Sequence, residues 1–187
     1  MDAEGIGYFD RMLAPGEIES VCRAALERDE YRAKRVLVVI PDHTRTCPLD
    51  ALFRHVYRCL AGRVSKLDFM IALGTHPPMS REMIYERVGI TAREHRTEFA
   101  RAEFLNHEWD NPDSLAEVGA LTAGEVGELT DGLFAIEVPI RVNRRVYDYD
   151  ILLIGGPVLP HEVVGFSGGN KYIFPGIAGA QIINFFH

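Results

Sequence analysis

Three short, mostly apolar runs constrain the fold of this chain more than any other feature. They span residues 35–40, 67–73 and 151–154. Continuous apolar runs of this length are typical of strands buried on both faces, as in parallel sheets covered by helices. Amphipathic helices are predicted at 17–28, 48–60 and 80–88, with Ser80 as the cap of the third. The order of these elements predicts an α/β fold, with a Rossmann-like parallel sheet and flanking helices.

The remaining segments give weaker signals. The spacing predicts a helix at 91–100, a short strand at 102–106, and two antiparallel strands at 133–138 and 141–146 around Pro139. Residues 109–132 are the least regular stretch. The last residues, 180–187, are apolar and resemble the start of a helix, whereas a natural terminus is usually polar and frayed. We therefore expect one domain, residues 1–187, truncated at its C-terminal end; the alternative is a genuine C-terminal helix docked on the core.

Charge and composition exclude several classes of protein. The chain has 20 Lys and Arg against 27 Asp and Glu, a net charge of −7, which argues against a nucleic-acid or anionic-membrane surface. It has neither an apolar run of ~18 residues nor a basic-then-apolar N-terminal signal. Its three cysteines, Cys22, Cys47 and Cys59, are scattered and without CxxC spacing. We expect a cytoplasmic protein with reduced thiols and no nucleic-acid or membrane partner.

The first candidate loop, residues 41–48, follows the first predicted strand. Ligands of parallel α/β sheets bind beyond the carboxyl ends of the strands. Thr44 and a helix N-terminus suit an oxyanion or phosphate, and Arg45 can clamp a carboxylate or phosphate at two points. Asp42 could orient Arg45 or accept from a ribose hydroxyl. The alternative is an ordinary turn in which Asp42 caps and Arg45 is solvated.

Two further strand ends each carry a histidine next to proline. His76 lies in the loop 74–80 before two prolines, and His161 follows Pro160 in the loop 155–162. A rigid loop that presents one imidazole suits general acid/base work. The alternative is a pair of surface histidines in stiff turns. His107, near the end of a possible strand, keeps an open role.

The segment 165–176 is rich in glycine and carries Lys171. Gly168 and Gly169, next to Ser167, allow a ligand to approach the backbone closely. An amine among apolar residues has its charged form disfavoured, so Lys171 can act as a nucleophile or form a covalent link. The segment is not a P-loop, because Asn170 and not glycine precedes the lysine. The alternative is a structural turn with a snorkelling lysine.

Taken together, these motifs resemble the lactate racemase family, which uses a nickel-pincer nucleotide. The ordered set consists of PDHTRT (41–46), GTH (74–76), PH (160–161), FSGGNK (166–171) and His187. The intervals of ten residues from His161 to Lys171 and sixteen to His187 match the family. The resemblance covers about residues 35–187 and implies the cofactor-binding N-terminal domain of a two-domain enzyme.

The resemblance also implies a role for each matching residue. Lys171 would tether the cofactor, nickel pyridinium-3,5-bisthiocarboxylic acid mononucleotide, and His187 would be a nickel ligand. His76 and His161 would be the catalytic pair that flanks the substrate carbon. Arg45 would hold substrate carboxylate or cofactor phosphate. The remaining cofactor shell would comprise Asp42, Thr44, Ser167, Gly168 and Gly169.

The implied activity is racemisation or epimerisation of a 2-hydroxy acid, lactate or a relative. In the family, hydride moves to the cofactor and back through a 2-keto acid, and a histidine on each side handles the hydroxyl proton. Cofactor-maturation enzymes would be further partners. The family's second domain, which supplies other substrate contacts, is missing from this chain, so the chain would form one wall of an active site and the cofactor could be absent from it.

Other functions remain open from the residues alone. The same loops could form a noncatalytic nucleotide- or anion-binding module, which would need neither nickel nor His76. An inactive apo fragment is a further alternative. A zinc hydrolase that uses His76, His161 and His187 is the weakest, because no compact metal-binding spacing such as HExxH occurs.

Overall fold

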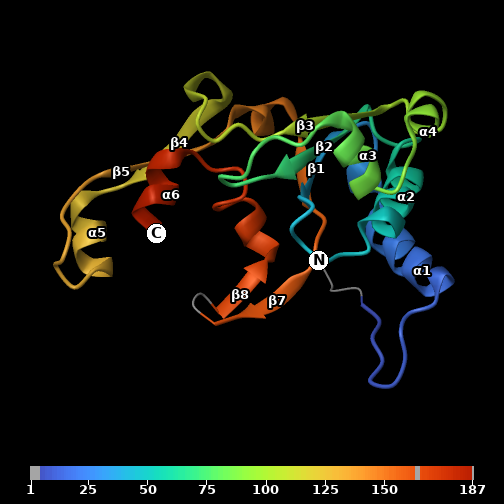
Figure 1. Cartoon of the computed structure of the whole chain (residues 1–187), viewed down its shortest axis with the longest axis horizontal. Coiled ribbons are helices and arrows are strands. Elements are labelled where there is room, and N and C mark those ends of the chain that lie inside the picture. Colours follow the sequence, from blue (N-terminus) through green and yellow to red (C-terminus); the bar gives the residue numbers. More distant parts are fainter. Residues whose placement is uncertain (1–4, 163–164, 187) are drawn as a thin grey trace.

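A four-stranded parallel sheet forms the centre of the molecule. We describe it from a computed structural model that covers residues 5–162 and 165–186 (Figure 1). The strand order is β3-β2-β1-β6. The strands are β1 (Arg35–Pro41), β2 (Lys66–Ala72), β3 (Ala102–Asn106) and β6 (Ile151–Ile154). All four coincide closely with the predicted runs, and the predicted parallel α/β fold is confirmed.

The helices α1 (Pro15–Leu26), α2 (Leu49–Leu60), α3 (Arg81–Arg87) and α4 (Ala92–Thr97) gather on one side of the sheet (Figure 1). Alternate residues of β1, such as Val38 and Ile40, point into the core that α1, α2 and α3 cover. Phe53 of α2 is 2% exposed and stacks edge-on against Phe69 of β2. The predicted cap of α3 is present, because the Ser80 hydroxyl accepts the Met83 N–H. The fourth helix is shorter than predicted.

The opposite face of the sheet is covered mainly by short turns. Leu37 and Val39 of β1 pack there against Tyr149, Tyr172 and Ile177. Tyr149 and Tyr172 lie in or beside two 3-10 turns, η3 (Arg144–Asp148) and η4 (Gly169–Tyr172), and Ile177 follows the second turn in the chain. The lysine-bearing segment is therefore held against the sheet by its own aromatic and aliphatic residues.

A second unit contradicts part of the prediction. Residues 109–132 contain a 3-10 turn η2 (Pro112–Ser114), strand β4 (Leu115–Leu121) and helix α5 (Ala123–Leu129). β4 pairs antiparallel with β5 (Val138–Asn143), so the predicted strand pair at 133–138 and 141–146 is wrong. Pro139 lies inside β5 and not at a turn; a ribbon of two strands leaves an edge on which a missing N–H is tolerated.

Helix α6 (Ala180–Phe186) forms where the sequence predicts it and packs on β5 and α5 through Ile182 and Ile183. A further antiparallel hairpin, β7 (Val158–His161) and β8 (Gly165–Gly168), projects beside η4 (Figure 1). Within the described residues, no helix has the length and apolar character that a membrane crossing requires.

The strand order places a ligand-binding crevice at a defined point. From β1 the chain moves to β2 and β3 on one side and later to β6 on the other. Strands are therefore added first on one side of β1 and then on the other, which makes the carboxyl ends of β1 and β6 a topological switch point. Asp42 directly follows β1, and Gly155 directly follows β6.

Candidate functional site

A pocket of about 290 Å³ opens at this carboxyl edge of the sheet. It is bounded by the loops after β1 and β2, the β7–β8 hairpin and η4. Residues from all four predicted motifs line it, namely Asp42, Arg45, His76, His161, Ser167, Gly168 and Lys171. Segments separated by more than a hundred residues thus contribute to one concave surface, as the strand-end rule predicts.

Asp42 and His76 form the tightest contact in the pocket. The Asp42 side chain is 3% exposed, and its Oδ2 lies 2.5 Å from Nδ1 of His76. Burial acts to raise the pKa of Asp42, but hydrogen bonds from Thr44 and His76 outweigh it and hold this pKa below its ordinary value. Asp42 is therefore a carboxylate at neutral pH and must accept from an Nδ1–H of His76. The Nε2 atom of a neutral His76 is left as a proton acceptor.

The rest of the loop after β1 is fixed by two anchors. Thr44 donates from its backbone N–H and its hydroxyl to Asp42 Oδ1, at 3.1 and 2.6 Å. Arg87 of α3 donates to the carbonyls of Arg45 and Cys47, at 2.8 and 3.4 Å. The Arg45 side chain remains exposed at the pocket. Arg87 is a site-supporting residue that the sequence analysis missed, because only the folded chain brings α3 to this loop.

The loop after β2 is tied directly to the lysine-bearing segment. Gly74, at φ +55°, donates its N–H to the carbonyl of Gly176 at 2.9 Å. A turn closed by the His76 N–H and the Leu73 carbonyl then presents the imidazole, which is 45% exposed. His76 is thus oriented on one nitrogen and open on its other side.

The β7–β8 hairpin supplies the opposite wall. His161 and Ser167 line the pocket from its two strands. Gly168 adopts φ +77°, and a Cβ there would lie 1.7 Å from the Pro157 carbonyl oxygen. Only glycine fits this position, so the predicted close approach of a glycine backbone is directed at the neighbouring strand.

Lys171 lies at the floor of the pocket, on η4. Its neighbours Tyr172 and Ile173 pack against the sheet, whereas Phe166 is 63% exposed on the hairpin. The lysine is half-buried beside the polar pocket and not enclosed by the aromatic residues around it in sequence. Burial raises the pKa of the Tyr172 hydroxyl, which stays protonated at neutral pH.

The pocket carries an excess of positive charge. Neither Lys171 nor the Arg45 guanidinium forms an ion pair with any residue of the described part of the chain. Among the described residues that line the pocket, Asp42 is the only carboxylate, and His76 and Thr44 already bind it. Two unpaired cations beside one engaged carboxylate favour an anionic ligand, such as a carboxylate or phosphate.

Three predicted site residues lie outside this lining. Thr44 contacts the pocket only through Asp42, and Gly169 lies next to its edge. His187, the predicted nickel ligand, lies outside the described residues. Within residues 5–162 and 165–186, no three His, Cys, Asp or Glu side chains are grouped so that they could hold a metal ion.

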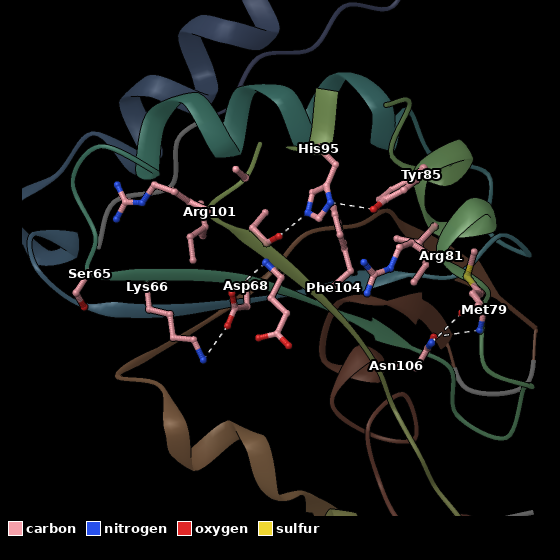
Figure 2. A pocket seen from close by; sticks show the side chains of 15 residues that line it. Ser65, Lys66, Asp68, Met79, Arg81, Tyr85, His95, Arg101, Phe104 and Asn106 are labelled. Carbon is pink, nitrogen blue, oxygen red and sulfur yellow. Dashed lines mark hydrogen bonds and ion pairs between the residues drawn. The ribbon is translucent and has the colours of Figure 1, made fainter. Parts of the chain in front are cut away.

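A larger hollow of about 570 Å³ lies at the edge strand β3, away from every predicted site residue. Figure 2 shows that several of its polar side chains bind one another or nearby backbone atoms. His95 contacts the Tyr85 hydroxyl and the Ala102 carbonyl, and Lys66 pairs with Asp68 at 2.9 Å. These groups are already engaged with one another, whereas Lys171 and Arg45 of the smaller pocket have no ion-pair partner among the described residues.

Comparisons with known proteins agree with the motifs. Residues 19–187 match the family described as the lactate racemase N-terminal domain. Two lactate racemases are similar in sequence. The protein from Thermoanaerobacterium thermosaccharolyticum is 27% identical over 154 residues, and that from Lactiplantibacillus plantarum 26% identical over 155. These alignments cover 80% and 81% of this chain, which spans 31% and 32% of the two relatives.

Solved structures give the same result for the fold. A Thermotoga maritima protein superimposes with a TM-score of 0.82 at 37% identity, over 94% of this chain and 41% of that one. The lactate racemase apoprotein from T. thermosaccharolyticum gives a TM-score of 0.64 at 26% identity, over 89% and 38%. With the family match over nearly the whole length, the chain belongs to the lactate racemase N-terminal domain family.

Proposed function

We propose that this chain forms the cofactor-binding wall of a 2-hydroxy-acid racemase or epimerase. The observation that carries the proposal is the joint presence of two imidazoles and two unpaired cations in one pocket at the switch point of the sheet. A 2-hydroxy acid presents a carboxylate and a hydroxyl, which are the groups that a cation and an imidazole bind. The part of the relatives that this chain does not span would close the open side of the pocket.

The residues of the pocket fit the cofactor that the family implies. Lys171 offers an amine for a covalent tether, and Arg45 offers an unpaired guanidinium for a phosphate. Ser167 and the backbone around Gly168 and Gly169 would enclose the group near its tether. His187 would be the nickel ligand, and an imidazole beside sulfur donors suits that metal. When bound, the nickel-pincer nucleotide supplies a hydride acceptor for the C2 hydrogen of the substrate.

The proton chemistry would belong to His76 and His161. Neutral His76, with its Nδ1–H held by Asp42, presents Nε2 to take the hydroxyl proton of the substrate. Asp42 then stabilises the imidazolium that results. His161 would do the same for the other enantiomer from the hairpin side. Arg45 would hold the carboxylate so that the substrate carbon stays between the two imidazoles.

A noncatalytic anion-binding module would also use the unpaired cations. Such a module has no need for an imidazole oriented by a buried carboxylate. The Asp42–His76 pair therefore favours the enzyme, because it fixes the ring tautomer in the way that a general base requires.

Interconversion of the lactate enantiomers tests the proposal. The chain is produced together with the remaining part of a lactate racemase, in cells that co-express cofactor-maturation enzymes, and D-lactate formed from L-lactate is measured by chiral chromatography. His76→Phe and His161→Phe should each reduce the rate by about 100-fold or more. His43→Phe is the matched control, since His43 is exposed in the first loop and does not line the pocket. Binding of 2-hydroxy acids by a loaded protein that interconverts none of them would favour the anion-binding module.

A further inference from the structure

The segment 176–179 connects the region of the proposed tether, Lys171, to the helix α6. It follows the Lys171 turn η4 and leads into α6, the helix that precedes His187. Backbone hydrogen bonds join it to residues Gly74, Asn143 and Arg141 of other segments. The Gly176 carbonyl accepts from Gly74, the Ile177 carbonyl from Asn143, and the Gly179 N–H donates to the carbonyl of Arg141. Residues 176–179 are all buried, so any polar group left without a partner there would be costly.

His107 supplies the hydrogen-bond partner of the Ala178 carbonyl in this segment. His107 directly follows β3 in the chain, and it is 1% exposed. Nε2 lies 2.9 Å from the carbonyl oxygen of Ala178, and Nδ1 lies 3.1 Å from the side-chain nitrogen of Asn143. The His107 backbone N–H is bound to Ile71 at the end of β2. One imidazole thus joins the parallel sheet to β5 and to the segment 176–179.

The surrounding bonds determine which nitrogen carries the proton. The Asn143 side-chain oxygen accepts the N–H of Arg145 at 3.1 Å, so its amide nitrogen must face the imidazole. The Nδ1 atom of His107 is therefore an acceptor. Nε2 then carries the hydrogen and donates it to Ala178. Burial lowers the pKa of His107, which agrees with the neutral ring that this network requires.

We propose that His107 is a positioning residue that fixes the segment between Lys171 and α6. It does so as the neutral Nε2–H tautomer, through the carbonyl of Ala178, and it is itself oriented by Asn143. The consequence for cofactor geometry rests on the proposed function. The tautomer of His107 and the anchoring of residues 176–179 are independent of the proposed function, and both can be measured in the chain without cofactor.

Two variants separate anchoring from simple filling of the core. His107→Gln keeps a side-chain N–H that can reach Ala178 and an oxygen that can accept from Asn143. His107→Phe keeps a buried ring of similar size but removes both hydrogen bonds. A residue that only fills space would tolerate Phe at least as well as Gln. An anchoring residue is rescued by Gln and not by Phe.

The first measurement is a long-range ¹H–¹⁵N correlation spectrum of the full chain labelled at histidine, which distinguishes the two neutral tautomers. We expect the Nε2–H form for His107 near pH 7. The second is native-state amide hydrogen exchange in the wild type and both variants. Phe should raise exchange at Asn143 and Gly179 by about tenfold or more, and Gln should stay within a few-fold of the wild type. The amides of Val38 and Val39 in β1 report global opening.

An Nδ1–H tautomer, or protection of Asn143 and Gly179 that survives His107→Phe, would overturn the inference. Exchange that rises equally in β1 would also overturn it, because His107 would then support the whole fold and not this segment. If His107→Phe prevents folding, the tautomer of wild-type His107 and the hydrogen exchange of His107→Gln still test the inference. A failure of Lys171 to take up cofactor would contradict the proposed function alone, since neither readout requires the loaded protein.

Discussion

The buried carboxylate of Asp42, at the end of β1, holds Nδ1 of His76, in the loop after β2, at a distance of 2.5 Å. The two residues are 34 positions apart, and the parallel pairing of β1 with β2 brings them together. Asp42 is 3% exposed on its side chain, whereas His76 is 45% exposed. A buried acceptor that orients an accessible imidazole is an arrangement suited to proton transfer.

Asp42→Asn should impair proton transfer while leaving the fold in place. An asparagine can donate to Nδ1, which shifts the hydrogen of neutral His76 to Nε2 and removes the base that faces the pocket. We expect the rate of lactate interconversion to fall by about 100-fold or more, with a much smaller change in KM. Asp29→Asn, at a side chain that is 89% exposed, is the control. A variant with wild-type turnover would exclude a role for the pair in catalysis.

The same carboxylate predicts a dependence of stability on pH. Its pKa in the folded chain lies below the ordinary value of about 3.9, because Thr44 and His76 bind the ionised form. This contribution to stability is complete above about pH 4 and is lost as the pH falls through the lower pKa of the folded state. Urea denaturation between pH 7 and pH 3 should show a steeper acid loss in the wild type than in Asp42→Asn. Parallel curves would contradict this pKa shift.

Arg87→Met should loosen the loop that presents Arg45. The substitution removes the donors to the carbonyls of Arg45 and Cys47 but keeps an unbranched aliphatic side chain at the end of α3. We expect faster hydrogen exchange at the Thr44 amide and a KM for 2-hydroxy acids raised by about tenfold. Arg81→Met, an exposed position at the start of the same helix, provides the comparison. Equal effects of the two substitutions would show that charge and not anchoring matters.

Gly168→Ala should disrupt the β7–β8 hairpin. The new methyl group would meet the Pro157 carbonyl, and φ +77° is unfavourable for alanine, so we expect a loss of more than about 2 kcal/mol in unfolding free energy. At Gly62, also in a turn, an added Cβ meets nothing within 4 Å and φ is not positive. Gly62→Ala should therefore change stability by less than about 1 kcal/mol. Chemical denaturation of the two variants measures the contrast.

The central sheet could be predicted from the sequence because its strands carry their signal locally. The runs at 35–40 and 151–154 are apolar on both faces, which a parallel sheet requires. The pair β4–β5 was harder, since β4 contains Gly119 and charged Glu117 and is largely exposed. Pro139 favours a turn in the sequence, although it lies within the β4–β5 ribbon.

The candidate site was largely predictable for a related reason. Strand ends that carry His, Arg or glycine are visible in the sequence, and parallel topology brings such ends to one edge. The supporting contacts were not visible. Arg87 and His107 donate hydrogen bonds to backbone carbonyls that lie 40 and 71 positions away in the chain. Every residue type has a backbone carbonyl, so the sequence does not indicate which carbonyl will accept such a bond. Long-range bonds to the backbone emerge only once the chain is folded.

The proposed covalent tether at Lys171 gives the most direct test of the proposed function. The measurement is the intact mass of the chain co-expressed with cofactor-maturation enzymes, with metal analysis and peptide mapping. Lys171→Ala should abolish modification, whereas Lys34→Ala should not, because Lys34 does not line the pocket. An adduct that contains nickel and sulfur and maps to Lys171 is the predicted result. An unmodified mass from folded protein, or an adduct that persists in Lys171→Ala, would contradict it.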